Sequence, residues 1–176
     1  MLKQFDCHRD GTWIALLFSD ESEIVAMTSD GRIVAFTVDE EFDVALRMLR
    51  RALALENLRV PREIDTAGRV KQELGVELKQ NVVLYVDDPI RLLEAIVICP
   101  SGGLFIPEPV VLSSVDLRSC RVSVRSMAPL FSSYLPPSLR VTIVNLHERI
   151  LAALQRIGQK QTPASEMLGY DTVTTV

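Results

Sequence analysis

Residues Thr12–Phe36 read TWIALLFSDESEIVAMTSDGRIVAF, and this stretch decides the expected fold class. It holds three apolar runs, Trp13–Phe18, Ile24–Met27 and Ile33–Phe36, which are separated by short polar segments. The dipeptide Asp30-Gly31 between the last two runs is typical of a tight hairpin turn, because both residues tolerate positive φ. The stretch therefore predicts an antiparallel β-meander.

Two later segments have the apolar period of amphipathic helices, namely Asp39–Asn57 and Ser138–Ile157. A weaker helix is expected over Asp65–Lys79, where Gly68 and Gly75 lower the helix propensity. The apolar stripes of the two long helices are Phe42, Ala45, Leu46, Leu49, Ala52 and Leu53 in the first, and Leu139, Ile143, Leu146, Ile150, Leu154 and Ile157 in the second.

The chain between these helices has mostly β character. The expected extended segments are Val82–Val86, Leu104–Ile106, Val110–Leu112 and Arg121–Arg125. Pro107 and Pro109 remove backbone donors, so they favour an edge or a bend for the strands around them. Ile90–Cys99 stays open, because Asp88-Pro89 is typical of a helix start whereas the apolar run Ile96–Cys99 is typical of a strand.

These patterns predict an α+β fold, with antiparallel β-meanders packed against two main amphipathic helices. An echo of Leu17–Asp20 in Leu84–Asp87 raises the alternative of two βββα-like modules. The expected organisation is an N-terminal meander with helices over residues 1–80, a β-rich segment with the long helix over residues 81–158, and a flexible tail over residues 159–176.

Composition narrows the class of protein. Apolar residues make up 48% and charged residues 24% of the chain, as in globular proteins. A net charge of −4 argues against a general nucleic-acid binder. The three scattered cysteines, Cys7, Cys99 and Cys120, favour reduced thiols in an intracellular, cytoplasmic protein. No apolar run is long enough for a membrane span.

The sequence holds no clear catalytic, cofactor or metal signature. The only histidines are His8 and His147, and no Cys-x-x-Cys, His-x-x-x-His or His-Glu-x-x-His spacing occurs. Tyr85–Asp88 matches the Tyr-x-Asp-Asp motif of reverse transcriptases and related polymerases, in which acids bind divalent ions. No partner strand offers a further acid, so we interpret this segment as an acidic strand end, and we expect no cofactor and no metal.

We therefore expect a non-enzymatic interaction or scaffold subunit of a larger intracellular assembly, which binds a protein partner or self-associates into an oligomer. The candidate partner-binding residues are a basic set on and after the first helix (Arg47, Arg50, Arg51, Arg59 and Arg62), apolar positions of the last helix (Val141, Val144 and Leu151), and the terminal pattern Thr174 and Val176, which strand-adding peptide pockets recognise.

Two alternatives remain at this point. One is an enzyme whose site is assembled from scattered residues, with Asp20, Asp30, Asp87, Asp88 and His147 as the candidates. The other is a viral or accessory protein that binds through the basic helix.

Overall fold

The computed structural model describes residues 33–127 and 135–160. The first two apolar runs of the expected meander, its Asp30-Gly31 turn and the terminal residues Thr174 and Val176 lie outside the described residues. The third run lies inside them and forms β1 (Ile33–Val38), as the pattern predicted.

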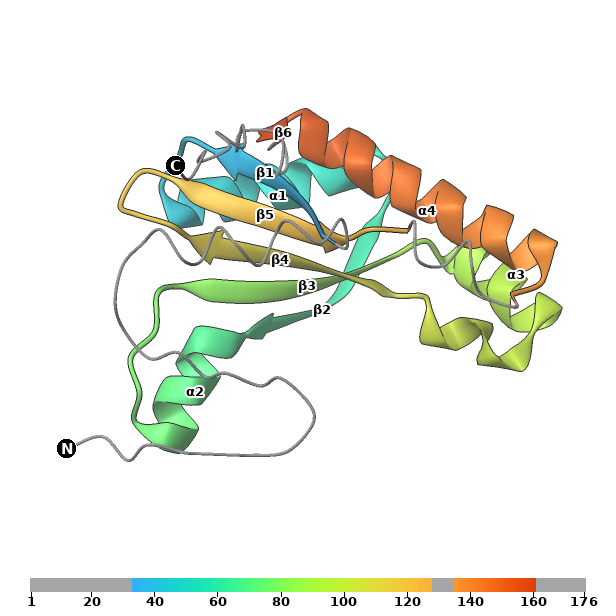
Figure 1. Ribbon diagram of the computed structural model, residues 1–176, viewed down its shortest axis with the longest axis horizontal. Helices are drawn as coiled ribbons and strands as arrows, with labels where there is room; N and C mark the ends of the chain where they lie inside the picture. The colour runs from blue at the N-terminus through green and yellow to red at the C-terminus, as the bar shows by residue number, and fades with distance from the viewer. Residues whose placement is uncertain (1–32, 128–134, 161–176) are drawn as a thin grey trace, which may run out of the picture.

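The described strands form one six-stranded sheet in the order β2-β3-β4-β5-β1-β6 (Figure 1). Every neighbouring pair is antiparallel. Strands from residues 1–80 and 81–158 therefore share one sheet. The other strands are β2 (Arg59–Asp65), β3 (Asn81–Asp87), β4 (Glu108–Ser114), β5 (Cys120–Arg125) and β6 (Gln159–Lys160).

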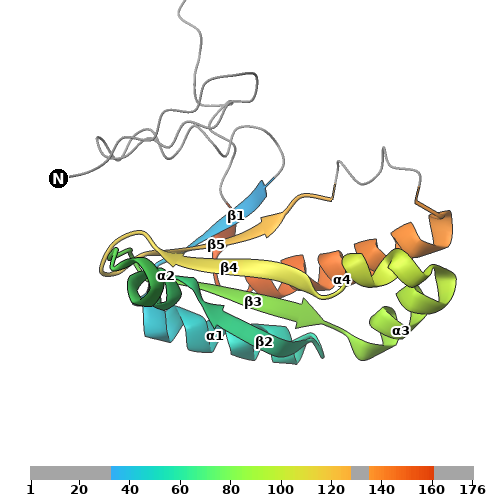
Figure 2. The same ribbon diagram turned by 90° about the horizontal axis from the view of Figure 1, so that it is seen from below.

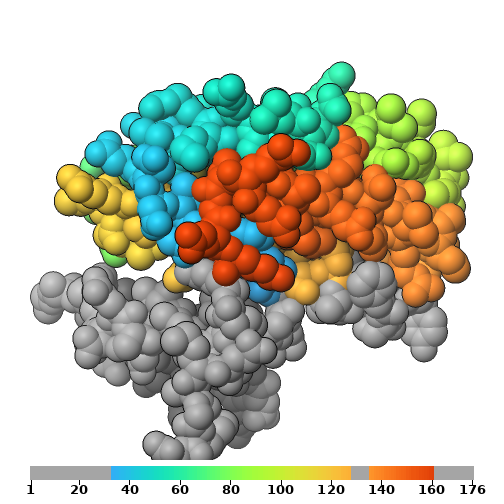
Figure 3. Space-filling view, turned by 90° about the horizontal axis from the view of Figure 1, so that it is seen from above, coloured from blue at the N-terminus to red at the C-terminus, as the bar shows by residue number. Residues whose placement is uncertain are grey.

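Helices cover one face of this sheet, which confirms the α+β class. α1 (Phe42–Leu55) and α4 (Pro137–Gln155) lie side by side on that face, and α3 (Pro89–Ile98) lies beside α4 at one end (Figure 3). α2 (Thr66–Leu74) follows β2 at the opposite end of the molecule (Figure 2).

The two long helices pack on the sheet through the stripes that their sequences predict. All six stripe residues of α1 are buried, and so are the first five of α4. They meet the alternating apolar residues of the strands, because one side chain in two points to the helical face. The largest buried side chains of this layer are Phe36, Leu49, Leu53, Leu84, Leu112, Leu139, Ile143, Leu146, Ile150 and Leu154.

α3 settles the ambiguity of Ile90–Cys99 in favour of a helix. The Asp88 side chain accepts a hydrogen bond from Ile90 N at 2.9 Å, and Pro89 occupies the first turn, so the helix start is capped. The strand interpretation of Ile96–Cys99 is therefore wrong.

The segment after α3 also differs from the prediction. Leu104–Ile106 was expected to be extended, but Pro100–Leu104 form a 3₁₀ turn, η2. This turn packs closely on α3, because a Cβ on Gly102 would collide with the Ala95 carbonyl. Glycine at this position thus permits a contact that the local apolar pattern does not reveal.

Prolines mark β2 and β4 in different ways. Pro107 and Pro109 were expected to favour an edge or a bend. β4 lies in the interior of the sheet, so the edge alternative is wrong; Pro109 is the second residue of the strand and pairs with Tyr85. β2 was not predicted as a strand. It is an edge strand with a register shift between Arg59 and Arg62, where a missing donor at Pro61 is tolerated.

Candidate functional site

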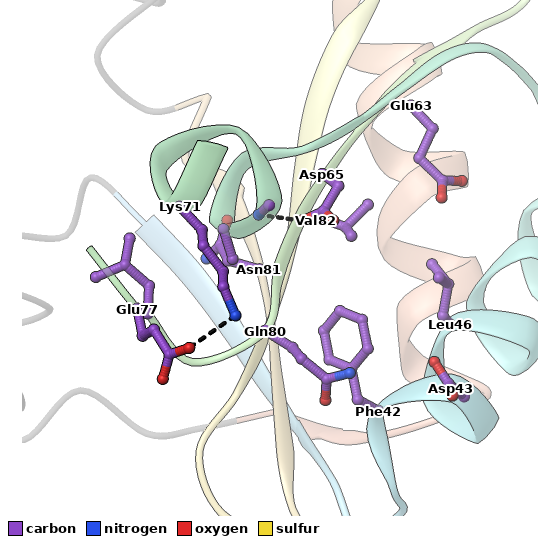
Figure 4. A pocket seen from close by; sticks show the side chains of 13 residues that line it. Phe42, Asp43, Leu46, Glu63, Asp65, Lys71, Glu77, Gln80, Asn81 and Val82 are labelled. Carbon is purple, nitrogen blue, oxygen red and sulfur yellow. Dashed lines mark hydrogen bonds and ion pairs between the residues drawn. The ribbon is translucent and has the colours of Figure 1, made fainter. Parts of the chain in front are cut away.

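A cleft of about 540 Å³ opens between α1 and α2, beside the β2 edge of the sheet (Figure 4). Its apolar part is formed by Phe42 and Leu46 from α1 and by Val82 from β3, which are largely buried. Leu78, from the segment between α2 and β3, adds an exposed apolar side chain to the lining. Its volume lies within the usual range for ligand-binding pockets.

Local interactions fix α2 at the side of this cleft. The Asp65 carboxylate caps the helix by accepting a hydrogen bond from Gly68 N at 2.8 Å. The Thr66 hydroxyl donates to the Asn81 carbonyl at 2.9 Å and so ties the helix to β3. Gly75 ends α2 with a φ of 68°, a left-handed conformation that favours glycine.

Acidic groups dominate the lining. The residues that line the cleft carry four carboxylates and one ammonium group. Lys71 and Glu77 form an ion pair at 2.7 Å, and their hydrogen bond raises the pKa of Lys71 and lowers the pKa of Glu77. Arg50, outside the lining, binds both oxygens of Glu63. The acidic residues of the lining are Asp43, Glu63, Asp65 and Glu77.

The uncompensated negative charge of the cleft is concentrated on two of these acids. Asp43 lies in the first turn of α1 and makes no ion pair with another described residue. Asp65 makes none either, although one of its oxygens caps α2. Both acids lie beside the apolar part of the lining, so the cleft favours a ligand that is cationic and partly apolar.

A second polar cluster lies away from the cleft, where β3 ends and β4 begins. His147 Nδ1 on α4 and Glu108 Oε1 on β4 are 2.9 Å apart, and both side chains are buried. The second oxygen, Glu108 Oε2, is buried without a hydrogen-bond partner. This buried pair connects the long helix to the centre of the sheet.

Next to this pair, Arg149 joins α4 to two other elements. Its guanidinium donates to the Asp88 carboxylate and to the Glu56 carbonyl at the end of α1. Burial alone would raise the pKa of Asp88, but the hydrogen bonds from Arg149 and from Ile90 N outweigh it and lower this pKa.

The family model for a domain of unknown function, DUF302, matches residues 34–157. The chain belongs to this family. It is also similar to a solved structure described as an uncharacterized conserved protein DUF302 from Bacillus stearothermophilus, with a TM-score of 0.63 and 18% sequence identity. The match covers 71% of this chain and 97% of that chain, and it supports the shared fold. No curated protein matches.

In this DUF302 domain, three of the five residues considered for an enzyme site come to one end of the molecule. Asp88 caps α3, His147 binds Glu108, and Asp87 ends β3, where burial raises its pKa despite the nearby Arg59. Asp20 and Asp30 lie outside the described residues. Across residues 33–127 and 135–160, no three His, Cys, Asp or Glu side chains are grouped to hold a metal ion.

Sequence reasoning missed Glu108 and the residues of the cleft. Glu108 lies between Pro107 and Pro109 at the start of an apolar strand. An acid at such a position needs a buried partner, so its place in the sequence was the one sign of a buried polar pair. The cleft offered no such signal, because its lining comes from two helices, two strands and a connecting segment.

The predicted basic residues lie on two neighbouring elements of the DUF302 domain. Arg47, Arg50 and Arg51 are exposed on α1, and Arg59 and Arg62 are exposed on β2. The ion pair between Arg50 and Glu63, at 2.6 Å, joins the two elements. Their role in partner binding stays a prediction.

The predicted apolar residues of α4 differ in exposure. Val141 is exposed, while Val144 is partly buried; both line a shallow hollow of about 490 Å³ on the outer side of the helix. Leu151 packs against the core. None of the described helices is both long and apolar enough to cross a membrane.

Proposed function

We propose that this DUF302 protein is a non-enzymatic interaction subunit that holds a basic segment of a partner protein in the cleft between α1 and α2. The observation that carries the proposal is the combination of an acidic rim and an apolar floor in one cleft. The free thiols Cys99 and Cys120 support a reducing, cytoplasmic setting for this assembly.

The chemistry of a Lys or Arg side chain matches both parts of the cleft. Its charged end would lie near the carboxylates of Asp43 and Asp65, and its aliphatic stem would contact the small remaining surface of Phe42 and Leu46. An apolar residue next to it in the partner chain would pack on Leu78, which is exposed in the free protein.

The same geometry predicts how binding depends on salt. Exposed carboxylates contribute little individually and are screened by ions. Because Phe42, Leu46 and Val82 are already buried in the free protein, Leu78 is the main apolar side chain that a ligand would cover. We therefore expect binding that weakens strongly with ionic strength, with a small remainder at about 0.5 M salt from the burial of Leu78, because burial of apolar surface is not screened.

Fluorescence anisotropy with labelled peptides tests the proposal. The probe is a peptide that alternates Lys or Arg with Leu, and the reference is the same peptide with Glu at each basic position. We expect the basic peptide to bind the full chain and Asp43→Lys to weaken it at least tenfold. Glu148→Lys is the matched control, because Glu148 is an exposed acid on α4 outside the cleft, and it should leave the affinity within twofold.

Three results would contradict the proposal. They are binding of the acidic reference peptide as tightly as the basic peptide, a loss of affinity in Glu148→Lys as large as in Asp43→Lys, and the absence of peptide binding by wild type. A further arm uses spermine and arginine methyl ester as free cations. If they compete at concentrations near the peptide's own Kd, the cleft serves a small organic cation instead of a protein segment.

A further inference from the structure

α3 leaves most of its apolar surface uncovered. Among its ten residues only Ala95 is buried, although the sequence PIRLLEAIVI is apolar around almost the whole helix. A helix with this composition is normally covered on several sides. The most exposed large side chains of α3 and of η2 are Ile90 (67%), Leu93 (64%), Ile96 (45%), Val97 (76%) and Leu104 (80%).

Helical spacing gathers these side chains on one face. Ile90, Leu93 and Val97 are separated by three and four residues, so they follow one line along the helix, and Ile96 lies beside that line. η2 extends the surface, because a Cβ added to Gly103 would lie 3.9 Å from Ile96 Cγ1, and Gly103 is followed by Leu104. We call these five residues, Ile90, Leu93, Ile96, Val97 and Leu104, the α3 stripe.

The attachment of α3 to the rest of the domain uses other residues. Ala95 packs against Gly102 of η2, and the Thr142 hydroxyl of α4 donates to Glu94 at 3.4 Å. Arg91 forms an ion pair with Glu94 at 2.8 Å. The α3 stripe is therefore not needed to hold the helix in place, and its exposure calls for a separate explanation.

The size of the α3 stripe fits an interface. Its five side chains leave on the order of 500 Å² of apolar surface uncovered, near the upper end for the largest patch on a typical monomer. A standard protein interface buries about 800 Å² per partner, so the stripe and a polar rim suffice for one side of a stable dimer.

We propose that the α3 stripe packs against the α3 stripe of a second copy of this chain, with the two helices antiparallel across a two-fold axis near Leu93. Ile90 precedes Leu93 by three residues and Val97 follows it by four. Reversing the direction of one helix thus brings Ile90 of each copy near Val97 of the other, and Leu93 near Leu93. A two-fold interface requires this kind of self-matching surface.

The charges beside the stripe favour a second copy over a different protein. The five stripe residues are uncharged, and Arg91 lies on the side of the helix opposite Leu93, where it forms an ion pair with Glu94, so the face carries no net charge that would repel its own copy. A face designed for a charged partner would carry an excess of one sign, as the cleft does.

Analytical ultracentrifugation of the full chain tests the proposal. We expect wild type to be a dimer at micromolar concentration, and Leu93→Asp and Leu93→Lys each to be monomers. Because Leu93 meets Leu93 across the axis, an equimolar mixture of these two variants should restore the dimer by pairing Asp with Lys. Val97→Asp should also give a monomer, and circular dichroism should show that all three variants are folded.

Val141→Asp is the matched control, because Val141 is exposed to 69% on the neighbouring helix but is not part of the α3 stripe. It should leave the dimer intact. The proposal is overturned if wild type is monomeric, if the Leu93 variants remain dimers, if their mixture stays monomeric, or if Val141→Asp dissociates the dimer as completely. None of these outcomes affects peptide binding in the cleft, so the two proposals fail separately.

Discussion

Removing His147 should expose how strongly the buried Glu108 depends on it. In His147→Leu, the Glu108 carboxylate stays at 1% side-chain exposure but loses the partner that lies 2.9 Å from Oε1, while Oε2 has none to begin with. An uncompensated buried charge of this kind costs about 3–5 kcal/mol. A domain of this size has about 5–15 kcal/mol of stability in total, so the variant should lose a large part of it.

The reverse substitution should be milder. Glu108→Leu leaves a buried imidazole without its acceptor, which costs about 1–3 kcal/mol. The double variant Glu108→Leu/His147→Leu removes both polar groups and fills the space with apolar atoms, so it should lie within about 1 kcal/mol of wild type or be more stable. The expected coupling between the two positions is thus at least ~3 kcal/mol.

Urea unfolding followed by circular dichroism measures all four members of this cycle, and thermal melts check them. About 2–4 °C of Tm accompany each kcal/mol in a chain of this length, so His147→Leu should melt roughly 6–20 °C lower. If the single variants each cost less than about 1 kcal/mol and their effects add, the pair is not isolated from water and the argument for its burial is wrong.

Three further predictions concern other contacts. Because the pKa of Asp88 is lowered in the fold, its ionised form stabilises the protein at neutral pH, and this contribution is lost as the pH falls below about 4. Arg149→Met should therefore flatten the pH dependence of the urea-unfolding free energy in that range. Burial raises the pKa of Asp87, so ionisation of Asp87 opposes folding. Asp87→Asn should raise Tm at pH 7, and the gain should fade as the pH approaches about 4. An unchanged Tm at pH 7 would contradict burial as the cause of the raised pKa. Gly158→Ala should destabilise the protein by about 1–3 kcal/mol, because the new Cβ would lie 2.6 Å from the Thr37 carbonyl, whereas Gly103→Ala, with its nearest contact at 3.9 Å, should leave the melting temperature within 2 °C.

Periodicity was sufficient to predict the two long helices and β5. The stripe from Phe42 to Leu53 is buried as predicted, because an amphipathic helix on a sheet can bury only the face that its sequence makes apolar. α3 was ambiguous because its apolar run has no polar face, and the capping residues Asp88 and Pro89 decide it. β2 was missed because Arg62 and Glu63 break the alternation, as an exposed edge strand allows.

The candidate site could not be predicted in the same way. Asp43 and Asp65 are 22 positions apart in the chain and line the same cleft only when α2 is fixed against β3. Glu108 and His147 are separated by 39 positions, and the residues around one of them give no sign of the other. Pairings of this kind depend on strand order, which no local pattern encodes.

α2, which lines the cleft, and α3, which carries the α3 stripe, lie at opposite ends of the domain (Figures 1 and 2). A dimer joined through α3 would therefore carry its two clefts at the outer ends, at a separation fixed by folded structure and not by a linker. Two basic segments of one partner chain could fill both clefts only if the chain between them spans that separation. Such a dimer would act as a molecular ruler, because its avidity would depend on the spacing of the basic segments.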